Sequence, residues 1–162
     1  MVRSFHIDDV DRINEIYNEA ISMGFNAFET TISLQNRLSW LNNRDNITYP
    51  IYVYQTKTKV IAWLYFSPYR ANRSSLAKTA EVSYYVDKAF WGKGIGSQLL
   101  KYAISVAPAL GFYTLVAILI ASNTNSIKLL QKFGFVQWAK LPNIVLKQGK
   151  PPQHHLYFGK NL

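Results

Sequence analysis

The sequence contains no cysteine, and it has no acidic residue after Asp87. Without cysteine, the 162-residue chain has no disulfide framework, no thiol nucleophile and no thiolate metal ligand. All nine Asp and Glu residues lie within residues 1–87, where nine Lys and Arg balance them, whereas residues 88–162 contain nine lysines and no carboxylate. The net charge of +9 therefore belongs to the C-terminal part. This asymmetry indicates a basic surface facing an anion, which could be nucleic acid, a membrane or a phosphate-bearing ligand.

The sequence also has no uninterrupted hydrophobic run long enough to span a membrane. The uncharged stretch 102–127 contains Pro108 and Gly111, which divide it into the end of a helix and a strand-like segment. Each piece is shorter than the ~20 apolar residues that a spanning helix needs. Two acids within the first nine residues argue against a secretory signal peptide. We therefore expect a cytoplasmic protein with a single domain over residues 1–162.

Hydrophobic periodicity predicts strands and helices that alternate along the chain. The first helix is expected to be capped by Asp8, and the second to begin at Ser33. Two strands at 51–55 and 60–66 are expected to form an antiparallel hairpin. The other predicted elements are strands at 2–5, 79–86, 113–119, 135–139 and 155–158, and helices from the 92–96 turn to about residue 110 and over 125–133. This order is typical of an α/β (α+β) domain with a mixed sheet.

A glycine-rich turn carries the clearest chemical signal. Its segment Trp91-Gly-Lys-Gly-Ile-Gly96 lies between a predicted strand and a predicted helix. Glycines let backbone N–H groups converge on phosphate oxygens without side-chain obstruction, and the following helix adds the positive end of its dipole. The turn therefore predicts a site for a phosphate or pyrophosphate. Glycines at this spacing also serve ordinary tight turns, which is the competing interpretation.

Other well-known sites do not fit the sequence. A Walker A motif requires a Lys followed by Ser or Thr after its glycines, and no such pair follows the glycines of residues 92–96. The dinucleotide-binding fingerprint does not match either, because the third glycine comes one residue early and no acid follows. His154 and His155 would point to opposite faces of a strand, far in sequence from His6, so no metal site is predicted. A hydrolase nucleophile elbow, Gly-x-Ser-x-Gly, is absent. The aromatic residues mostly have aliphatic neighbours, which favours core packing over base stacking.

Several sequence blocks resemble the GNAT N-acetyltransferase superfamily. Trp91-Gly-Lys-Gly-Ile-Gly96, following Tyr84-Tyr-Val86, is similar to the acyl-CoA pyrophosphate loop of that superfamily, and the block from Asn123 to Phe135 resembles its next motif, which ends in Lys-x-Gly-Phe. The group of phosphinothricin and methionine sulfoximine acetyltransferases is the most similar, through Ile16-Tyr-Asn-Glu-Ala-Ile21, Ala27-Phe-Glu-Thr30, Pro68-Tyr-Arg70 and Thr79-Ala-Glu-Val-Ser-Tyr-Tyr-Val86. The resemblance covers roughly residues 2–140.

This resemblance implies a GNAT fold: a mixed, mostly antiparallel twisted sheet flanked by helices, with a splayed cleft for acyl-CoA. It implies acetyl-CoA as co-substrate and no metal. The backbone of residues 84–86 would pair with the pantetheine arm, the amides of residues 92–97 would hold the pyrophosphate, and Asn123 would contact the pantetheine. The implied cofactor-binding residues are Tyr84, Tyr85, Val86, Gly92, Lys93, Gly94, Ile95, Gly96, Ser97 and Asn123. We expect the positive charge of the C-terminal part to concentrate around residues 92–97.

The resemblance also implies acceptor-side residues. Glu81 matches the position of an acid credited with general-base work, although it could equally pair with Arg70 or Lys78. Its pKa would need to rise by desolvation, or a water relay would be required, for it to accept an ammonium proton efficiently. Arg70 and Arg73 suit bidentate binding of a carboxylate or phosphinate, but they could also be ordinary solvated surface charges. Glu29 could orient an ammonium or one of these arginines, or it could instead be a cap before a helix or part of a salt bridge.

Departures from the family pattern leave several points open. Leu130 stands where these enzymes carry Tyr or His as general acid, so Tyr84 or Tyr113 could protonate the thiolate, the thiolate could leave unaided, or activity could be impaired. Trp91 stands where Arg or Gln is expected. The C-terminal segment, which lines the acceptor pocket in the family, matches poorly.

The sequence thus predicts an acetyltransferase that transfers acetyl from acetyl-CoA directly to the primary amine of a small molecule, such as an amino-acid analogue. We expect a homodimer, and we expect neither a nucleic-acid partner nor a membrane partner. The alternatives are a basic nucleic-acid-binding module and a member of the fold that binds acyl-CoA without catalysis.

Overall fold

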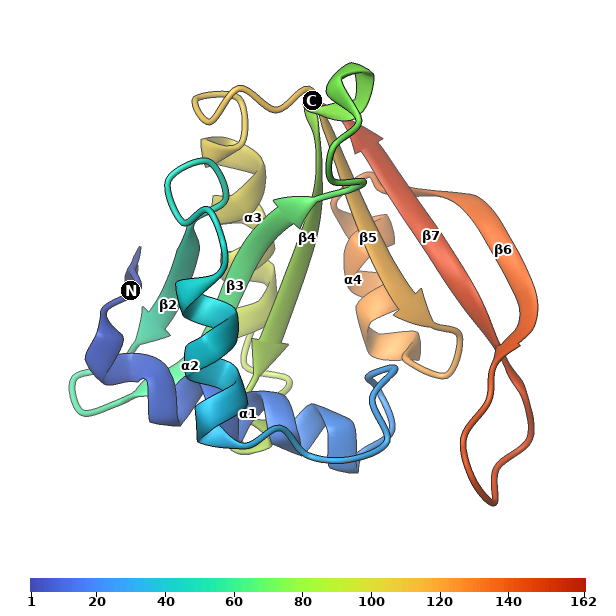
Figure 1. Ribbon diagram of the computed structural model, residues 1–162, viewed down its shortest axis with the longest axis horizontal. Helices are drawn as coiled ribbons and strands as arrows, with labels where there is room; N and C mark the ends of the chain where they lie inside the picture. The colour runs from blue at the N-terminus through green and yellow to red at the C-terminus, as the bar shows by residue number, and fades with distance from the viewer.

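A seven-stranded sheet in the order β1-β2-β3-β4-β5-β7-β6 forms the centre of the computed structural model, which describes all residues from 1 to 162 (Figure 1). Only β4 and β5 run parallel, and every other neighbouring pair is antiparallel. This confirms the predicted mixed, mostly antiparallel sheet. The strands are β1 Val2–Ser4, β2 Ile51–Gln55, β3 Val60–Pro68, β4 Thr79–Val86, β5 Thr114–Ile120, β6 Val136–Val145 and β7 Gln153–Asn161.

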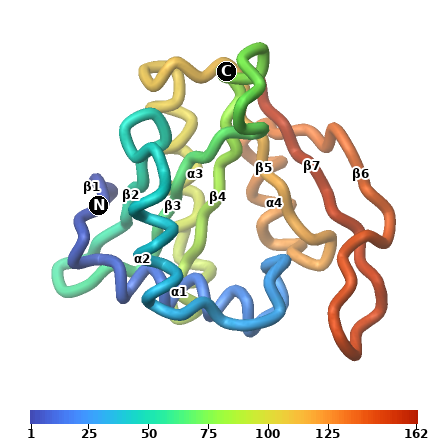
Figure 2. The backbone as a smooth tube through the Cα atoms, in the orientation of Figure 1, coloured from blue at the N-terminus to red at the C-terminus, as the bar shows by residue number.

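Helices cover both faces of this sheet, as the ribbon and the backbone tube show (Figures 1 and 2). α1 (Val10–Ser22) and α2 (Leu34–Asn42) lie on one face, and α3 (Ile95–Val106) and α4 (Thr124–Lys132) lie on the other. No helix is both long enough and apolar enough to cross a membrane. As predicted, α2 begins directly after Ser33, whose side chain accepts a hydrogen bond from the N–H of Asn36 at 3.2 Å.

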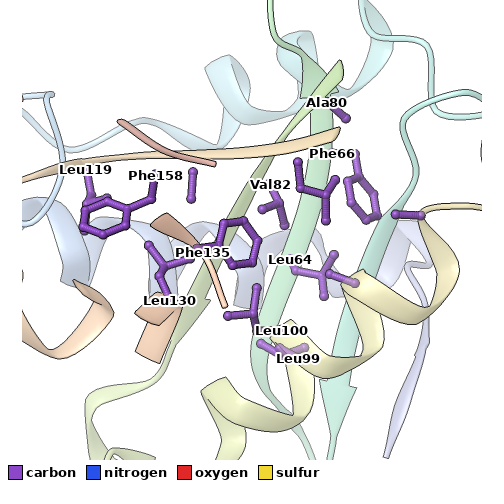
Figure 3. Packing of buried hydrophobic residues seen from close by; sticks show 14 of the residues in the cluster. Leu64, Phe66, Ala80, Val82, Leu99, Leu100, Leu119, Leu130, Phe135 and Phe158 are labelled. Carbon is purple, nitrogen blue, oxygen red and sulfur yellow. The ribbon is translucent and has the colours of Figure 1, made fainter. Parts of the chain in front are cut away.

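Each face of the sheet carries its own hydrophobic core. On the α3 and α4 face, buried side chains of β3, β4 and β5 pack against the helices; Figure 3 shows Leu64 and Val82 of the sheet beside Leu99 and Leu100 of α3. On the α1 and α2 face, ten buried residues include Ile13, Ile16 and Trp63. Successive side chains of a strand point to opposite faces of the sheet. The side chains of β4 are therefore divided between the two sides of the cleft.

The structure corrects three local predictions. Asp8 does not cap the first helix: Asp9 precedes α1, and its carboxylate instead accepts from Arg3 and from the N–H of His6. α3 ends at Val106 rather than near residue 110, because a turn leads into Pro108. β6 and β7 are longer than predicted. β6 is an exposed edge strand with register shifts, so it lacks the alternation that normally reveals a strand.

The parallel pairing of β4 with β5 is short. It covers residues 79–81 and 114–116, whereas β5 pairs with β7 over its whole length and β4 pairs with β3 to Val86. Beyond Glu81, β4 follows β3 and β5 follows β7, so the two strands separate. This divergence confirms the splay that the family resemblance implied.

Candidate active site

A cleft opens where β4 and β5 separate. It consists of a pocket of about 520 Å³ and a narrower pocket of about 60 Å³ between the two strands, and five residues line both: Phe25, Tyr84, Tyr85, Asn123 and Ser126. The narrow pocket is therefore the inner end of the larger one. The larger pocket is otherwise lined by Ala20, Met23, Val86, Phe90, Trp91, Gly92, Gly94, Ile95, Gly96, Ser97, Asn125, Leu129 and Lys132.

The outer end of the cleft is built for a phosphate. Gly92 and Gly94 have left-handed φ angles of 72° and 77°, which a residue with a Cβ adopts only at a cost. Gly94 precedes α3 and supplies no side-chain cap, so the first N–H groups of the helix, at residues 95–97, have no partner within it. These amides and the helix dipole point into the pocket as anion donors. Gly96 packs closely against α4, because a Cβ there would meet Cδ2 of Leu129 at 3.0 Å and the leucine would have to shift.

Lysines contribute less to this pocket than the sequence predicts. Only Lys132 among the lysines lines it. Lys93 lies in the turn, but its Nζ donates to the carbonyl of Ala89 at 3.0 Å and sits over the ring of Phe90. Lys147 bonds to carbonyls of the α1–α2 loop, on Gly24 and Asn26. Lys93 and Lys147 thus direct their charges to main-chain carbonyls, and the backbone amides are the main anion donors of the pocket.

The backbone of β4 presents alternate residues to the gap. The N–H of Asp87 donates to the carbonyl of Ile61 on β3, so by alternation the backbone groups of Tyr85 also face β3. Tyr84 and Val86 face the gap instead. Of the three residues expected to pair with pantetheine, these two have the required backbone direction, and Tyr85 contributes its ring on the other face.

The side chain of Trp91 forms a hydrogen bond with one of the backbone groups that face the gap. Its Nε1 donates to the carbonyl of Val86 at 2.8 Å, and its ring approaches that of Phe25 with centroids 6.0 Å apart. A tryptophan where the family pattern has Arg or Gln therefore links the phosphate turn to the end of β4 and forms an aromatic wall of the pocket. The sequence showed the departure but not this contact, and Phe25 had no sequence signal because only the path of the α1–α2 loop brings it here.

Glu81 is the last residue of β4 that pairs with β5, and its side chain lies on the α1 and α2 face. Its carboxylate forms no hydrogen bond and no ion pair. The alternative partner Lys78 instead lies over the ring of Tyr113, with Nζ 4.8 Å from the centroid. Burial without a compensating partner raises the pKa of Glu81 to about 7. The neighbouring Tyr65 and Tyr85 are half-buried with their hydroxyls away from solvent, and this desolvation raises their pKa values as well.

The predicted acceptor residues do not meet one another. Glu29 belongs to the α1–α2 loop, and its carboxylate accepts a hydrogen bond of 2.8 Å from the N–H of Gln148 in the β6–β7 loop. Arg70 and Arg73 are exposed in the β3–β4 loop and contact no acid. In Figure 1 the α1–α2 loop lies at the lower edge of the molecule and the β3–β4 loop at the upper edge. The structure thus gives Glu29 a loop-joining contact and leaves both arginines free.

The α4 side of the cleft is largely apolar. Asn123 caps α4 through its side-chain oxygen, which accepts from the N–H of Ser126 at 3.2 Å, and its amide nitrogen remains available. Leu130 is 1% exposed and lines the narrow pocket. Of the two tyrosines considered as proton donors, Tyr113 is 65% exposed at the far end of β5, whereas Tyr84 lines the cleft. Tyr113 is therefore ruled out.

Known proteins share this architecture. The model of the acetyltransferase (GNAT) family matches residues 11–135. YwnH of Bacillus subtilis, whose name as a phosphinothricin acetyltransferase is provisional, is 35% identical over 144 residues, which cover 88% of this chain and 87% of that protein. The L-methionine sulfoximine/L-methionine sulfone acetyltransferase of Salmonella typhimurium is 32% identical over 143 residues, which cover 88% of this chain and 83% of that protein.

A solved structure agrees with these relatives. The phosphinothricin acetyltransferase of Sinorhizobium meliloti, in complex with acetyl-CoA, superposes with a TM-score of 0.91 at 27% identity, covering 100% of this chain and 88% of that one. The splayed strands, the glycine turn before α3 and these matches lead to one conclusion: the chain belongs to the GNAT family of acetyltransferases.

Proposed function

We propose that this acetyltransferase uses acetyl-CoA as donor and transfers its acetyl group directly to the primary amine of a small amino-acid-like molecule, with Glu81 as general base. One observation supports the proposal: the unpaired carboxylate of Glu81 lies on β4 where that strand separates from β5, and the free amides that begin α3 line the cleft that opens beyond this point.

The residues of the cleft suit acetyl-CoA. The N–H groups of residues 95–97 offer donors to a pyrophosphate, and Lys132 adds a positive charge at the pocket. The backbones of Tyr84 and Val86 face the gap in which an extended amide-containing arm would pair as a strand does. When bound, acetyl-CoA supplies a thioester activated toward amines. The donor for the carbonyl oxygen would then be the N–H of Tyr84 or Val86, since that of Tyr85 faces β3.

Glu81 has the properties of a base for amine deprotonation. A general base works best when its pKa lies near the operating pH, and burial brings the pKa of Glu81 to about 7. The carboxylate accepts the proton that the amine nitrogen loses as it bonds to the carbonyl carbon. Bringing both substrates into one cleft supplies a further part of the rate.

The class of acceptor substrate is inferred from the names of related enzymes and from the ability of arginine to bind a carboxylate. Related enzymes are named for methionine sulfoximine, methionine sulfone and phosphinothricin, which are amino-acid analogues. Such a substrate carries a carboxylate that a guanidinium binds bidentately, and Arg70 and Arg73 follow β3 at the end of the sheet where Glu81 pairs with Ser67. Glu29 could orient the substrate ammonium only by giving up its contact with Gln148.

The first experiment is thiol release from acetyl-CoA across an amine panel that includes methionine sulfoximine, methionine sulfone and phosphinothricin. We expect turnover with at least one of them, and a loss of roughly 10²-fold or more in kcat for Glu81→Gln. Glu15→Gln is the matched control, because Glu15 is exposed on α1 and pairs only with Arg12. Unchanged turnover in Glu81→Gln would reject the base assignment.

The same assay, combined with binding, separates the alternatives. Saturable thermal stabilisation by acetyl-CoA without thiol release across the panel would favour a binding-only member of the fold. Nucleic-acid binding that weakens steeply with salt, without stabilisation by acetyl-CoA, would favour the basic binding module.

A homodimer and a cytoplasmic location complete the proposal. β6 is an edge strand with Val136, Trp138 and Ile144 exposed by 62%, 50% and 54%, and apolar side chains on an open edge favour burial against a second copy. Light scattering that gives a monomer mass at micromolar concentration would reject the dimer. Fractionation of the producing cells tests the location.

A further inference from the structure

The hydroxyl of Tyr84 is a buried donor without a partner. Its Oη has no hydrogen bond in the protein, although burial of an unpaired hydroxyl is costly. The hydroxyl of Ser126 on α4 is close enough to lower the pKa of Tyr84 slightly against the effect of burial, but it forms no hydrogen bond with Oη. A buried polar atom left unpaired beside a cleft points to a partner that arrives with a ligand.

The position of Tyr84 shows which part of a ligand it would meet. The residue lines both the large pocket and its narrow inner end, so it stands at their junction. A pyrophosphate held by the amides at residues 95–97 occupies the outer end, and the arm that follows it leads inward past Tyr84. The thioester would therefore lie near this junction.

Apart from Ser126, the side chains around Tyr84 on this side of the cleft offer no free hydroxyl. Leu129 and Leu130 make the adjoining part of α4 apolar, and the side-chain oxygen of Asn123 is already used in the helix cap. The hydroxyl of Tyr85 is on the opposite face of β4, within 3.4 Å of the Asn26 amide. Tyr84 is thus the ring on the α4 side of β4 that carries an O–H into the cleft.

We propose that the Tyr84 hydroxyl donates a hydrogen bond to the sulfur of CoA and so stabilises it as a leaving group. This role rests on the proposed function of the cleft. Residues 81 and 84 project to opposite faces of β4, so the base and the sulfur donor approach the reacting thioester from opposite sides of the sheet.

The chemistry balances without a proton from Tyr84. The amine nitrogen bonds to the carbonyl carbon and loses a proton to Glu81; the carbon–sulfur bond then breaks and its electron pair stays on sulfur. Burial raises the pKa of Tyr84 to about 12, so its proton stays on oxygen while the hydroxyl donates to the departing thiolate. The thiolate takes up a proton from water after release.

The test compares the binding of CoA with that of desulfo-CoA, which lacks the thiol, by isothermal titration calorimetry. Wild-type protein is expected to bind CoA several-fold more tightly. Tyr84→Phe is expected to bind CoA at the desulfo-CoA level and to keep the affinity for desulfo-CoA. In turnover, kcat should fall about 10- to 100-fold, as for loss of a hydrogen bond to a charged group, with the KM for the amine unchanged. Tyr113→Phe is the matched control and should match wild type in both measurements.

The outcomes separate this role from the proposed function. Equal loss of affinity for both ligands in Tyr84→Phe would show that the ring only fills space and would overturn the proposal, as would an unchanged preference for CoA. Failure of wild-type protein to bind CoA at all would overturn the proposed function and this role together. Tyr84→Phe removes an unpaired buried hydroxyl, so we expect it to fold and to melt no lower than wild type, and Tyr84→Leu provides a second variant without the hydroxyl.

Discussion

The desolvated, half-buried carboxylate of Glu81 should make the stability of this protein depend on pH in a defined direction. Its ordinary pKa is 4.5, and burial without a partner raises the pKa to about 7 in the folded protein. Below pH 4.5 the group is protonated whether the chain is folded or not, so it imposes no electrostatic penalty. Between pH 4.5 and 7 the unfolded chain ionises first, and folding stability falls as pH rises. Above pH 7 both states are ionised and the penalty is constant.

The size of this penalty follows from the two pKa values. The difference between 4.5 and about 7 corresponds to about 3 kcal/mol of stability lost at high pH. Glu81→Gln removes the titration, so its stability relative to wild type should rise by about this amount between pH 4.5 and pH 8. For a chain of this size, each 1 kcal/mol shifts Tm by roughly 2–4 °C. The expected relative gain at pH 8 is thus roughly 6–12 °C, accompanied by loss of catalysis.

Urea unfolding of the wild type and of Glu81→Gln at pH 4.5, 6, 7 and 8 measures this effect. Glu15→Gln, at an exposed carboxylate, serves as control and should change stability by no more than about 0.5 kcal/mol at each pH. A stability difference between wild type and Glu81→Gln that does not grow with pH would refute the reasoning, because it would mean that Glu81 ionises as easily in the folded protein as in the unfolded chain.

Three further perturbations test other parts of the structure. Gly94→Ala forces a Cβ into a left-handed conformation at φ 77° and should cost about 1–2 kcal/mol while weakening acetyl-CoA binding, as measured by urea unfolding and calorimetry; unchanged values in both would contradict the assigned turn geometry. Asp87→Ala removes the buried carboxylate that pairs with Arg12 and caps the turn before the glycines, so a loss on the order of 3 kcal/mol is expected in urea unfolding, and a loss below about 1 kcal/mol would show that the pair contributes little. Ser33→Ala deletes the cap hydrogen bond to Asn36 and should cost about 1 kcal/mol, whereas Ser33→Asp should retain most of the stability.

Local sequence determined most of the framework. β-branched and aromatic runs specified β2, β3 and β4 because a strand buried on its faces needs such residues along its whole length. The glycine turn was readable because no other residue occupies left-handed φ angles at low cost, and the phosphate chemistry of the turn follows from its place before a helix. The length of the edge strand β6 was underestimated, because exposure and register shifts remove the periodic hydrophobic pattern that predicts a strand.

The chemistry of the site was decided by tertiary packing. The position of Glu81 in the sequence says nothing about its desolvation, which depends on tertiary neighbours such as Tyr65 of the adjoining strand β3. Likewise, only the pairing of β4 with β3 decides that Tyr84 faces the gap, and only the loop path brings Phe25 into the cleft. Sequence by itself specified which groups this protein has and the local geometry of its phosphate turn. The fold decided which groups are desolvated, which backbone groups face the gap between β4 and β5, and which lysine lines the pocket, because these depend on contacts between residues far apart in the chain.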